Sequence, residues 1–228
     1  MNAVVIPARG GSKRIPKKNI IDFCGKPMIA WSIESALQAN IFDKVIVSTD
    51  NEEIADVSKK YGAEVPFIRP QELSDDYTGT IDVIEHSVRW LLEQKLEIEN
   101  ICCLYATAPF VSCLDLRAGL EILRNSNSEY VFAATDYGFP IQRSFFLNAN
   151  DDIEMFYPEH FQTRSQDLVQ AYHDAGQFYW GKASSWLLKK EVFTKNSRPI
   201  FLPRYKVQDI DTYEDLQRAK LIFNMIQK

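Results

Sequence analysis

Cationic side chains gather around a pair of glycines in one short segment near the start of the chain. The cations are Arg9, Lys13, Arg14, Lys17 and Lys18, and the glycines are Gly10 and Gly11. Glycine has no Cβ, so the backbone N–H groups of such a loop can approach oxygen atoms closely while the cations surround them. This combination of residues favours the binding of a polyanion such as a chain of phosphates.

The loop is neither of the two commonest phosphate-binding motifs. Neither Gly-x-x-x-x-Gly-Lys-Ser/Thr nor Gly-x-Gly-x-x-Gly can be read in it. A solvated loop or a nucleic-acid patch is the alternative interpretation of a basic cluster. The loop follows directly on an apolar run at residues 4–7, which predicts a first strand, and α/β sheets bind ligands at the carboxyl ends of their strands. We therefore favour a small anionic ligand.

Two carboxylates near the other end of the chain have the spacing of a metal site. Asp209 and Asp211 lie two residues apart in Val-Gln-Asp-Ile-Asp-Thr, so an extended backbone places both on one face. Mg²⁺ is commonly held by one or two carboxylates, with water and substrate phosphates completing six oxygens. The alternative is that Asp211 or Thr212 caps the helix that follows, and the two roles are compatible.

The sequence between these motifs alternates predicted strands and helices. Apolar runs predict strands at residues 4–7, 44–49, 62–68, 101–105 and 130–135. Helical spacing predicts helices at residues 28–39, 51–61, 81–93, 114–123 and 213–226. This order predicts an α/β fold with a doubly wound, mostly parallel sheet in a single domain, residues 1–228. Asp50 ends the second strand at the same sheet edge as the loop, although its more ordinary role would be to cap the next helix.

The alternation breaks between residues 136 and 174. Turn residues around an Asn-Ala-Asn-Asp-Asp sequence, residues 148–152, predict a hairpin. We interpret residues 136–174 as a small arm inserted in the domain, after which a strand at residues 172–180 returns to the sheet.

Composition narrows the class of protein. A formal net charge of −5 and a pI near 5.3 argue against nucleic acid as the main partner. The four cysteines lack the spacing of a metal site. No stretch predicts a leader sequence or a membrane span, so we expect a cytoplasmic protein without a membrane partner.

The two motifs together resemble a known family. Ile-Pro-Ala-Arg-Gly-Gly-Ser-Lys-Arg-Ile-Pro-Lys-Lys-Asn at residues 6–19 and Gln-Asp-Ile-Asp-Thr at residues 208–212 are similar to the CMP-sialic acid synthetases, cytidylyltransferases that activate acidic nine-carbon sugars. The resemblance spans essentially the whole chain. It implies a Rossmann-like nucleotidyltransferase fold and attack of the sugar's anomeric hydroxyl on CTP, with release of pyrophosphate. It also implies a Mg²⁺ cofactor and a homodimer in which the arm lies over the partner's active site.

The resemblance assigns roles to individual residues. Those implied in CTP binding are Ala8, Gly10, Gly11, Ser12, Asn19, Arg69, Ser74, Thr80 and Thr107. Those implied in catalysis are Arg9, Lys13, Lys18 and Asp209. Metal binding is assigned to Asp209 and Asp211. Those implied in sugar binding are Gln142, Arg143, Arg164, His173 and Gln177.

The sugar and the proton acceptor are less well specified. Residues 139–143 and 172–180 look most like the pseudaminic acid branch of the family, with N-acetylneuraminic and legionaminic acids as alternatives. Arg143 and Arg164 suit a sugar carboxylate, because a planar guanidinium pairs with one through two parallel hydrogen bonds. The alternative is a surface ion pair or a brace between the arm and the body. His173 is a candidate base, but Asp174 beside it in a strand would point to the opposite face, so we assign no general base.

Two other functions fit the same residues. One is a related nucleotidyltransferase that loads a sugar phosphate or the eight-carbon acid Kdo. The other is a nucleotide-binding regulatory module, which would bind CTP without turning it over.

Overall fold

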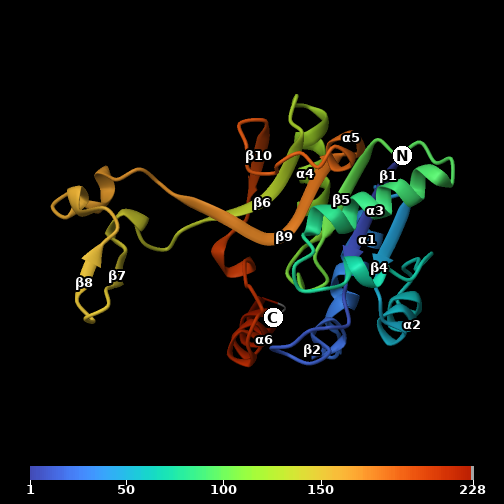
Figure 1. Ribbon diagram of the computed structural model, residues 1–228, viewed down its shortest axis with the longest axis horizontal. Coiled ribbons are helices and arrows are strands. Elements are labelled where there is room, and N and C mark those ends of the chain that lie inside the picture. Colours follow the sequence, from blue (N-terminus) through green and yellow to red (C-terminus); the bar gives the residue numbers. More distant parts are fainter. Residues whose placement is uncertain (227–228) are drawn as a thin grey trace.

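The computed structural model describes residues 1–226, and a six-stranded sheet forms its centre (Figure 1). The strand order is β10-β6-β9-β5-β1-β4. The strands are β1 (Asn2–Pro7), β4 (Lys44–Ser48), β5 (Asn100–Leu104), β6 (Tyr130–Asp136), β9 (Tyr172–Lys182) and β10 (Ser197–Phe201). Neighbouring strands are parallel except at β9, which runs antiparallel to both β5 and β6. The predicted mostly parallel sheet is confirmed.

Helices cover both faces of this sheet. One face carries α1 (Met28–Ala39), α2 (Glu52–Lys60) and α4 (Cys113–Arg124), and the other carries α3 (Thr80–Glu93) and α5 (Ala183–Leu187). Alternate residues of β1 supply the two cores: Val4 and Ile6 pack on one side, Ala3 and Val5 on the other. A strand buried on both faces reads as a continuous apolar run, which is why the sequence predicted its position.

A third apolar cluster joins the two ends of the chain. Ile15 and Phe23, from the segment after β1, are buried against Ile210 and against Phe223 of α6 (Tyr213–Ile226). The Phe23 and Phe223 rings meet edge to face, with centroids 5.2 Å apart. Figure 1 shows this arrangement, with the blue N-terminal segment beside the red terminal helix. This packing holds the acid pair next to the cationic loop, although the two are far apart in sequence.

Two elements differ from the predictions. Residues 62–68 form no strand; they touch β4 through two isolated parallel bridges, Ile46–Glu64 and Thr49–Ile68. Pro66 lies between the bridges and has no N–H to donate, so a continuous ladder is interrupted there. The sheet gains β10 instead, an edge strand that tolerates Pro199 at its centre because its outer side needs no partner.

An arm leaves the body between β6, which ends at Asp136, and β9, which begins at Tyr172. It contains an antiparallel hairpin of β7 (Phe145–Leu147) and β8 (Ile153–Met155). Figure 1 shows the hairpin standing clear of the sheet. Large apolar side chains of the arm are exposed, including Phe139 at 87% and Phe161 at 71%.

The helices of the described chain, residues 1–226, are all too short or too polar to span a lipid bilayer.

Candidate nucleotide site

A cleft of about 310 Å³ lies at the carboxyl ends of β1 and β5. Three segments line it: the cationic loop after β1, the segment between residues 69 and 80, and the turn that follows β5. The residues of the predicted site that the cleft brings together are Arg9, Ser12, Lys13, Lys18, Asn19, Arg69, Thr80 and Thr107. The position agrees with the general rule that α/β sheets bind ligands at this edge.

The loop is held in place by hydrogen bonds to its own backbone. The N–H of Gly10 donates to Asp50 Oδ1 (2.8 Å), and Asn19 Nδ2 donates to the carbonyl of Arg9 (2.9 Å). Ala8 is buried, and its N–H continues the β1–β4 ladder by donating to the carbonyl of Ser48 (2.9 Å). The N–H of Gly10 is therefore already hydrogen-bonded within the protein. Gly11 faces open space, because a Cβ added to it would meet no atom within 4 Å.

The prediction that Asp50 caps the next helix was wrong. Asn51 is the N-cap of α2, and its side chain accepts a hydrogen bond from the N–H of Ile54 (3.0 Å). Asp50 turns instead towards the loop, where it lies between the Gly10 amide and the guanidinium of Arg69 (3.9 Å). Either residue type suits an N-cap, so the sequence could not tell which of the two neighbours would fill that role.

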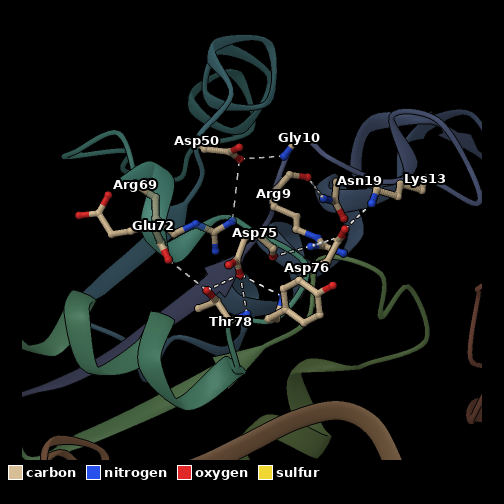
Figure 2. A network of polar contacts seen from close by, with 11 residues as sticks. Arg9, Gly10, Lys13, Asn19, Asp50, Arg69, Glu72, Asp75, Asp76 and Thr78 are labelled. Carbon is tan, nitrogen blue, oxygen red and sulfur yellow. Dashed lines mark hydrogen bonds and ion pairs between the residues drawn. The ribbon is translucent and has the colours of Figure 1, made fainter.

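A carboxylate from the chain itself lies between two cations of the cleft (Figure 2). Asp76 forms ion pairs with Arg9 (2.8 Å) and with Lys13. Arg9 also donates to the carbonyl of Asp75 (2.6 Å), whose side chain accepts hydrogen bonds from Thr78 and so closes the turn. The hydrogen bond from Lys13 lowers the pKa of Asp76, which keeps it ionised. The cations predicted to hold an anion thus already hold one, and sequence reasoning missed it.

Arg69 forms the floor of the cleft. Its side chain is only 3% exposed, and its Nε donates to Ser74 Oγ (3.1 Å). Burial lowers the pKa of Arg69, and the negative charge of Asp50 acts in the opposite direction. Ser74 is absent from the cleft lining, so its hydroxyl orients Arg69 from behind.

The acid pair meets the loop at the far side of the cleft. Lys18 Nζ donates to the carbonyl of Ile210 (2.9 Å) and pairs with Asp211 (3.1 Å), and Arg14 pairs with the other oxygen of Asp211 (2.8 Å). Asp209 is exposed and has no polar side-chain contact within the described residues. Burial of part of its surface, and then the charge of Asp211, raises the pKa of Asp209. Two carboxylates repel each other when they lie close together, and a divalent cation bound between them would relieve this repulsion.

Neither Asp209 nor Asp211 caps α6, because the cap is formed by Thr212 and Asp215. The N–H of Asp215 donates to Thr212 Oγ1 (3.2 Å), and the N–H of Thr212 donates to Asp215 Oδ2 (2.9 Å). Thr212 therefore caps the terminal helix, as one of the predicted alternatives had it. The carboxylates of Asp209 and Asp211 are left for other uses.

A second pocket of about 570 Å³ adjoins the cleft, and Thr80 and Tyr105 line both cavities. The two hydroxyls lie 3.2 Å apart and form a shared wall. Apolar side chains dominate the second pocket: Ile81, Trp186, Val192 and Phe193. The polar residues that line it include Asp174 and Tyr179 of β9, which the sequence analysis did not assign to the site.

The residues predicted for sugar binding line neither of these two cavities. The side chain of Arg143 donates to the carbonyl of Thr163 (2.7 Å), and Arg164 pairs with Asp167 (2.7 Å), both within the arm. The Arg164 contact is a surface ion pair, one of the predicted alternatives, whereas the Arg143 contact is neither an ion pair nor a brace to the body.

Three more of those residues bond elsewhere. Gln142 donates to the carbonyl of Val169 in the arm (2.9 Å), and the buried Gln177 donates to the carbonyl of Lys206 (2.6 Å). His173 Nδ1 lies 2.9 Å from the backbone oxygen of Asp174, not from its carboxylate. Asp174 therefore does not orient the His173 ring through its side chain, as strand geometry predicted.

No group of three or more His, Cys, Asp or Glu residues within residues 1–226 is arranged to hold a metal ion. A metal at Asp209 and Asp211 would therefore take its remaining ligands from water and substrate, which is the usual coordination of Mg²⁺.

The chain is similar to proteins of known activity. Residues 3–224 match a protein family described as Cytidylyltransferase. A pseudaminic acid cytidylyltransferase of Campylobacter jejuni subsp. jejuni is 48% identical over 224 residues, covering 98% of this chain and 97% of that protein. A CMP-N,N'-diacetyllegionaminic acid synthase of Legionella pneumophila subsp. pneumophila is 30% identical over 230 residues, covering 98% and 97%.

The fold has a counterpart among solved structures. CMP:2-keto-3-deoxy-manno-octonic acid synthetase complexed with CTP matches 99% of both chains with a TM-score of 0.71 and 19% sequence identity. At this identity the likeness concerns the fold alone.

Proposed function

The chain belongs to the cytidylyltransferase family, and on this premise we propose that it transfers CMP from CTP to the anomeric hydroxyl of an acidic nine-carbon sugar, pseudaminic acid, with release of pyrophosphate. One observation carries the proposal. The cationic loop lines the cleft, and the acid pair from the opposite end of the sequence is joined to this loop through the ion pair of Lys18 and Asp211 (3.1 Å).

The cleft residues suit nucleotidyl transfer. The anomeric oxygen attacks the α-phosphorus, and the bond from that phosphorus to the pyrophosphate oxygen breaks. Negative charge grows on the departing pyrophosphate, so fixed cations lower the barrier. Arg9, Lys13 and Lys18 lie where they would balance this charge. Asp76 must leave Arg9 and Lys13 when the triphosphate enters, because the two anions compete for the same cations.

The reaction on a triphosphate calls for a divalent cation, and we propose Mg²⁺ held by Asp209 and Asp211. Within residues 1–226 the carboxylate of Asp209 forms no ion pair, and Asp211 is fixed by Arg14 and Lys18 at the edge of the cleft. When bound, the ion would polarise the α-phosphate and lower the pKa of the attacking hydroxyl. The protein would then need no side chain as a general base.

The second pocket is our proposed site for the sugar. It touches the cleft only through the wall of Thr80 and Tyr105, so a sugar bound there has its reactive end beside the nucleotide. Its apolar sides suit the uncharged part of the molecule. In this arrangement CTP lies against the cationic loop, and the acceptor lies against Trp186 and Phe193.

A homodimer would place a partner's arm over this region. The arm stands clear of its own body and exposes apolar rings, which favours burial against another chain. Arg143 and Arg164 would then reach the sugar carboxylate of the partner's site. Light scattering should give twice the mass of the chain, and replacement of Phe139 and Phe161 by serine should shift it towards the monomer. A wild-type monomer with full activity would overturn this part.

The product identifies the sugar. CTP is incubated with pseudaminic, legionaminic and N-acetylneuraminic acids side by side, and the CMP-sugars are measured by mass spectrometry. We expect CMP-pseudaminic acid to form fastest. The similarity to a legionaminic acid enzyme makes CMP-legionaminic acid the second candidate product. CTP binding without pyrophosphate release from any acid would favour a regulatory module and overturn the proposal.

We also propose that the reaction takes place in the cytoplasm, where the nucleoside triphosphate is available. Cell fractionation followed by an activity assay tests this, and activity confined to the extracellular fraction would contradict it.

A further inference from the structure

Asp174 points into the second pocket because β9 is irregular. Asp174 and Tyr179 are an odd number of residues apart, so a regular strand would place them on opposite faces. The register between β6 and β9 shifts between Phe132 and Ala134, and Gly176 takes a positive φ of 60°. Such bulges commonly re-aim a side chain next to an active site. Both side chains consequently line the same pocket.

The Asp174 carboxylate is held in a fixed position. One oxygen accepts a hydrogen bond from the N–H of Gly176 (3.0 Å), and the other accepts the hydroxyl of Tyr179. Burial, and then the neighbouring Tyr105 and Asp174, raises the pKa of Tyr179, so this hydroxyl keeps its proton and donates it. Each carboxylate oxygen can accept a second hydrogen bond, and the pocket is the side from which it can come.

Among residues 1–226, no cation lines the pocket to match this carboxylate. Its charged lining consists of Asp82, Asp174 and Glu191. Asp174 forms no ion pair within residues 1–226, whereas Asp82 is paired with Lys189 (2.6 Å). A sugar carboxylate would be repelled here. A hydrogen-bond donor attached to an apolar group would instead satisfy both the acid and the surrounding rings.

We propose that Asp174 determines which acceptor is used and which way round it binds. It accepts a hydrogen bond from the N–H of an acylamino substituent, while Trp186 and Phe193 pack against the acyl group. Its charge turns the carboxylate end of the sugar away, towards the wall of Thr80 and Tyr105 and the nucleotide beyond. This inference rests on the proposed function and adds the part of the sugar that the pocket recognises.

The experiment compares two acceptors that differ by one N–H. One is the acidic sugar with its acylamino group, and the other carries the O-acyl ester at the same position. The ratio of their kcat/KM values, at saturating CTP, isolates the hydrogen bond. We expect wild type to prefer the acylamino sugar about tenfold or more, since hydrogen bonds to charged groups are among the stronger ones.

Asp174→Ala should bring that ratio close to one, and Asp174→Asn, which keeps the shape, should reduce it severalfold. The KM for CTP should change less than twofold in both variants. Asp136→Asn is the matched control, an acid of the neighbouring strand that faces Arg204 outside the pocket and should leave the ratio unchanged. Thermal unfolding shows whether each variant is folded.

An unchanged ratio in folded Asp174→Asn and Asp174→Ala would overturn the inference while the proposed function stands. Equal losses of kcat/KM for both acceptors would mean that Asp174 only supports the strand, and this result would also overturn the inference. Absence of any CMP-sugar from wild type would instead refute the proposed function, so the two failures can be told apart.

Discussion

The two cavities that share Thr80 and Tyr105 are built in opposite ways. In the cleft, cations outnumber acids and are paired with carboxylates of the chain: Arg9 and Lys13 with Asp76, and Arg14 and Lys18 with Asp211. In the second pocket the walls are apolar, and every charged lining residue is an acid. One cavity is suited to receive an anion, and the other to turn the carboxylate end of an acidic ligand away from Asp174.

The difference also concerns how firmly each acid is held. Asp76 is about 38% exposed and contacts only flexible cations, so an incoming triphosphate can exchange with it at low cost. Asp174 is fixed by a backbone amide and a buried hydroxyl, so it stays when a ligand arrives. We infer that the first carboxylate keeps the cations in place until substrate replaces it, and that the second is a permanent part of the recognition surface.

The largest expected effect comes from Asp209, the carboxylate of the acid pair that forms no ion pair within residues 1–226. Asp209→Asn should lower kcat about a thousandfold, because the proposed Mg²⁺ loses its unpaired ligand and the α-phosphate its charge stabilisation. The kcat is measured from the rate of pyrophosphate release over a series of Mg²⁺ concentrations. Asp22→Asn, which removes an exposed acid that faces Lys220 outside the cleft, is the control. Wild-type kcat in folded Asp209→Asn would remove the metal site from the account.

Lys18→Met should lower kcat about a hundredfold, the usual cost of removing one donor that stabilises a developing negative charge. Lys18 also ties the loop to Ile210 and Asp211, so some thermal stability should be lost as well. The neighbouring cation provides a matched control, since Lys17 pairs with Glu53 and does not line the cleft. If Lys17→Met were as damaging as Lys18→Met, net charge and not position would be the cause.

The smallest effect should have the opposite sign. Asp76→Asn removes the competitor for Arg9 and Lys13, so the KM for CTP should fall about two- to fivefold at low ionic strength, and less at high salt. Asp56→Asn, on the exposed face of α2, is the control and should change neither the KM for CTP nor its dependence on salt. A KM that rises in Asp76→Asn would mean that this carboxylate assists the bound substrate, and the contrast between the two cavities would no longer hold.

The sequence predicted five of the six strands of the described sheet and the family, because each depends on local patterns. Runs such as Val4–Ile6 identify buried strands, and residues 6–19 identify the loop. It missed features that depend on contacts between distant segments or on backbone irregularity. Asp76 reaches Arg9 only because a turn closed by Asp75 and Thr78 presents it.

Asp174 was not assigned to the site for a related reason. Alternation along a regular strand says which side chains share a face, but a bulge changes that assignment and leaves little trace in sequence. Gly176 was the one available signal, because glycine in a strand often marks such a bulge. His173 drew attention by its chemistry, whereas its neighbour faces the pocket.

A crystal structure with CTP and Mg²⁺ bound would show whether the loop and the acid pair share one triphosphate. We expect the phosphates against Arg9, Lys13 and Lys18, the metal at Asp209 and Asp211, and Asp76 displaced from both cations. A nucleotide bound elsewhere, with Asp76 still paired to Arg9 and Lys13, would contradict the account.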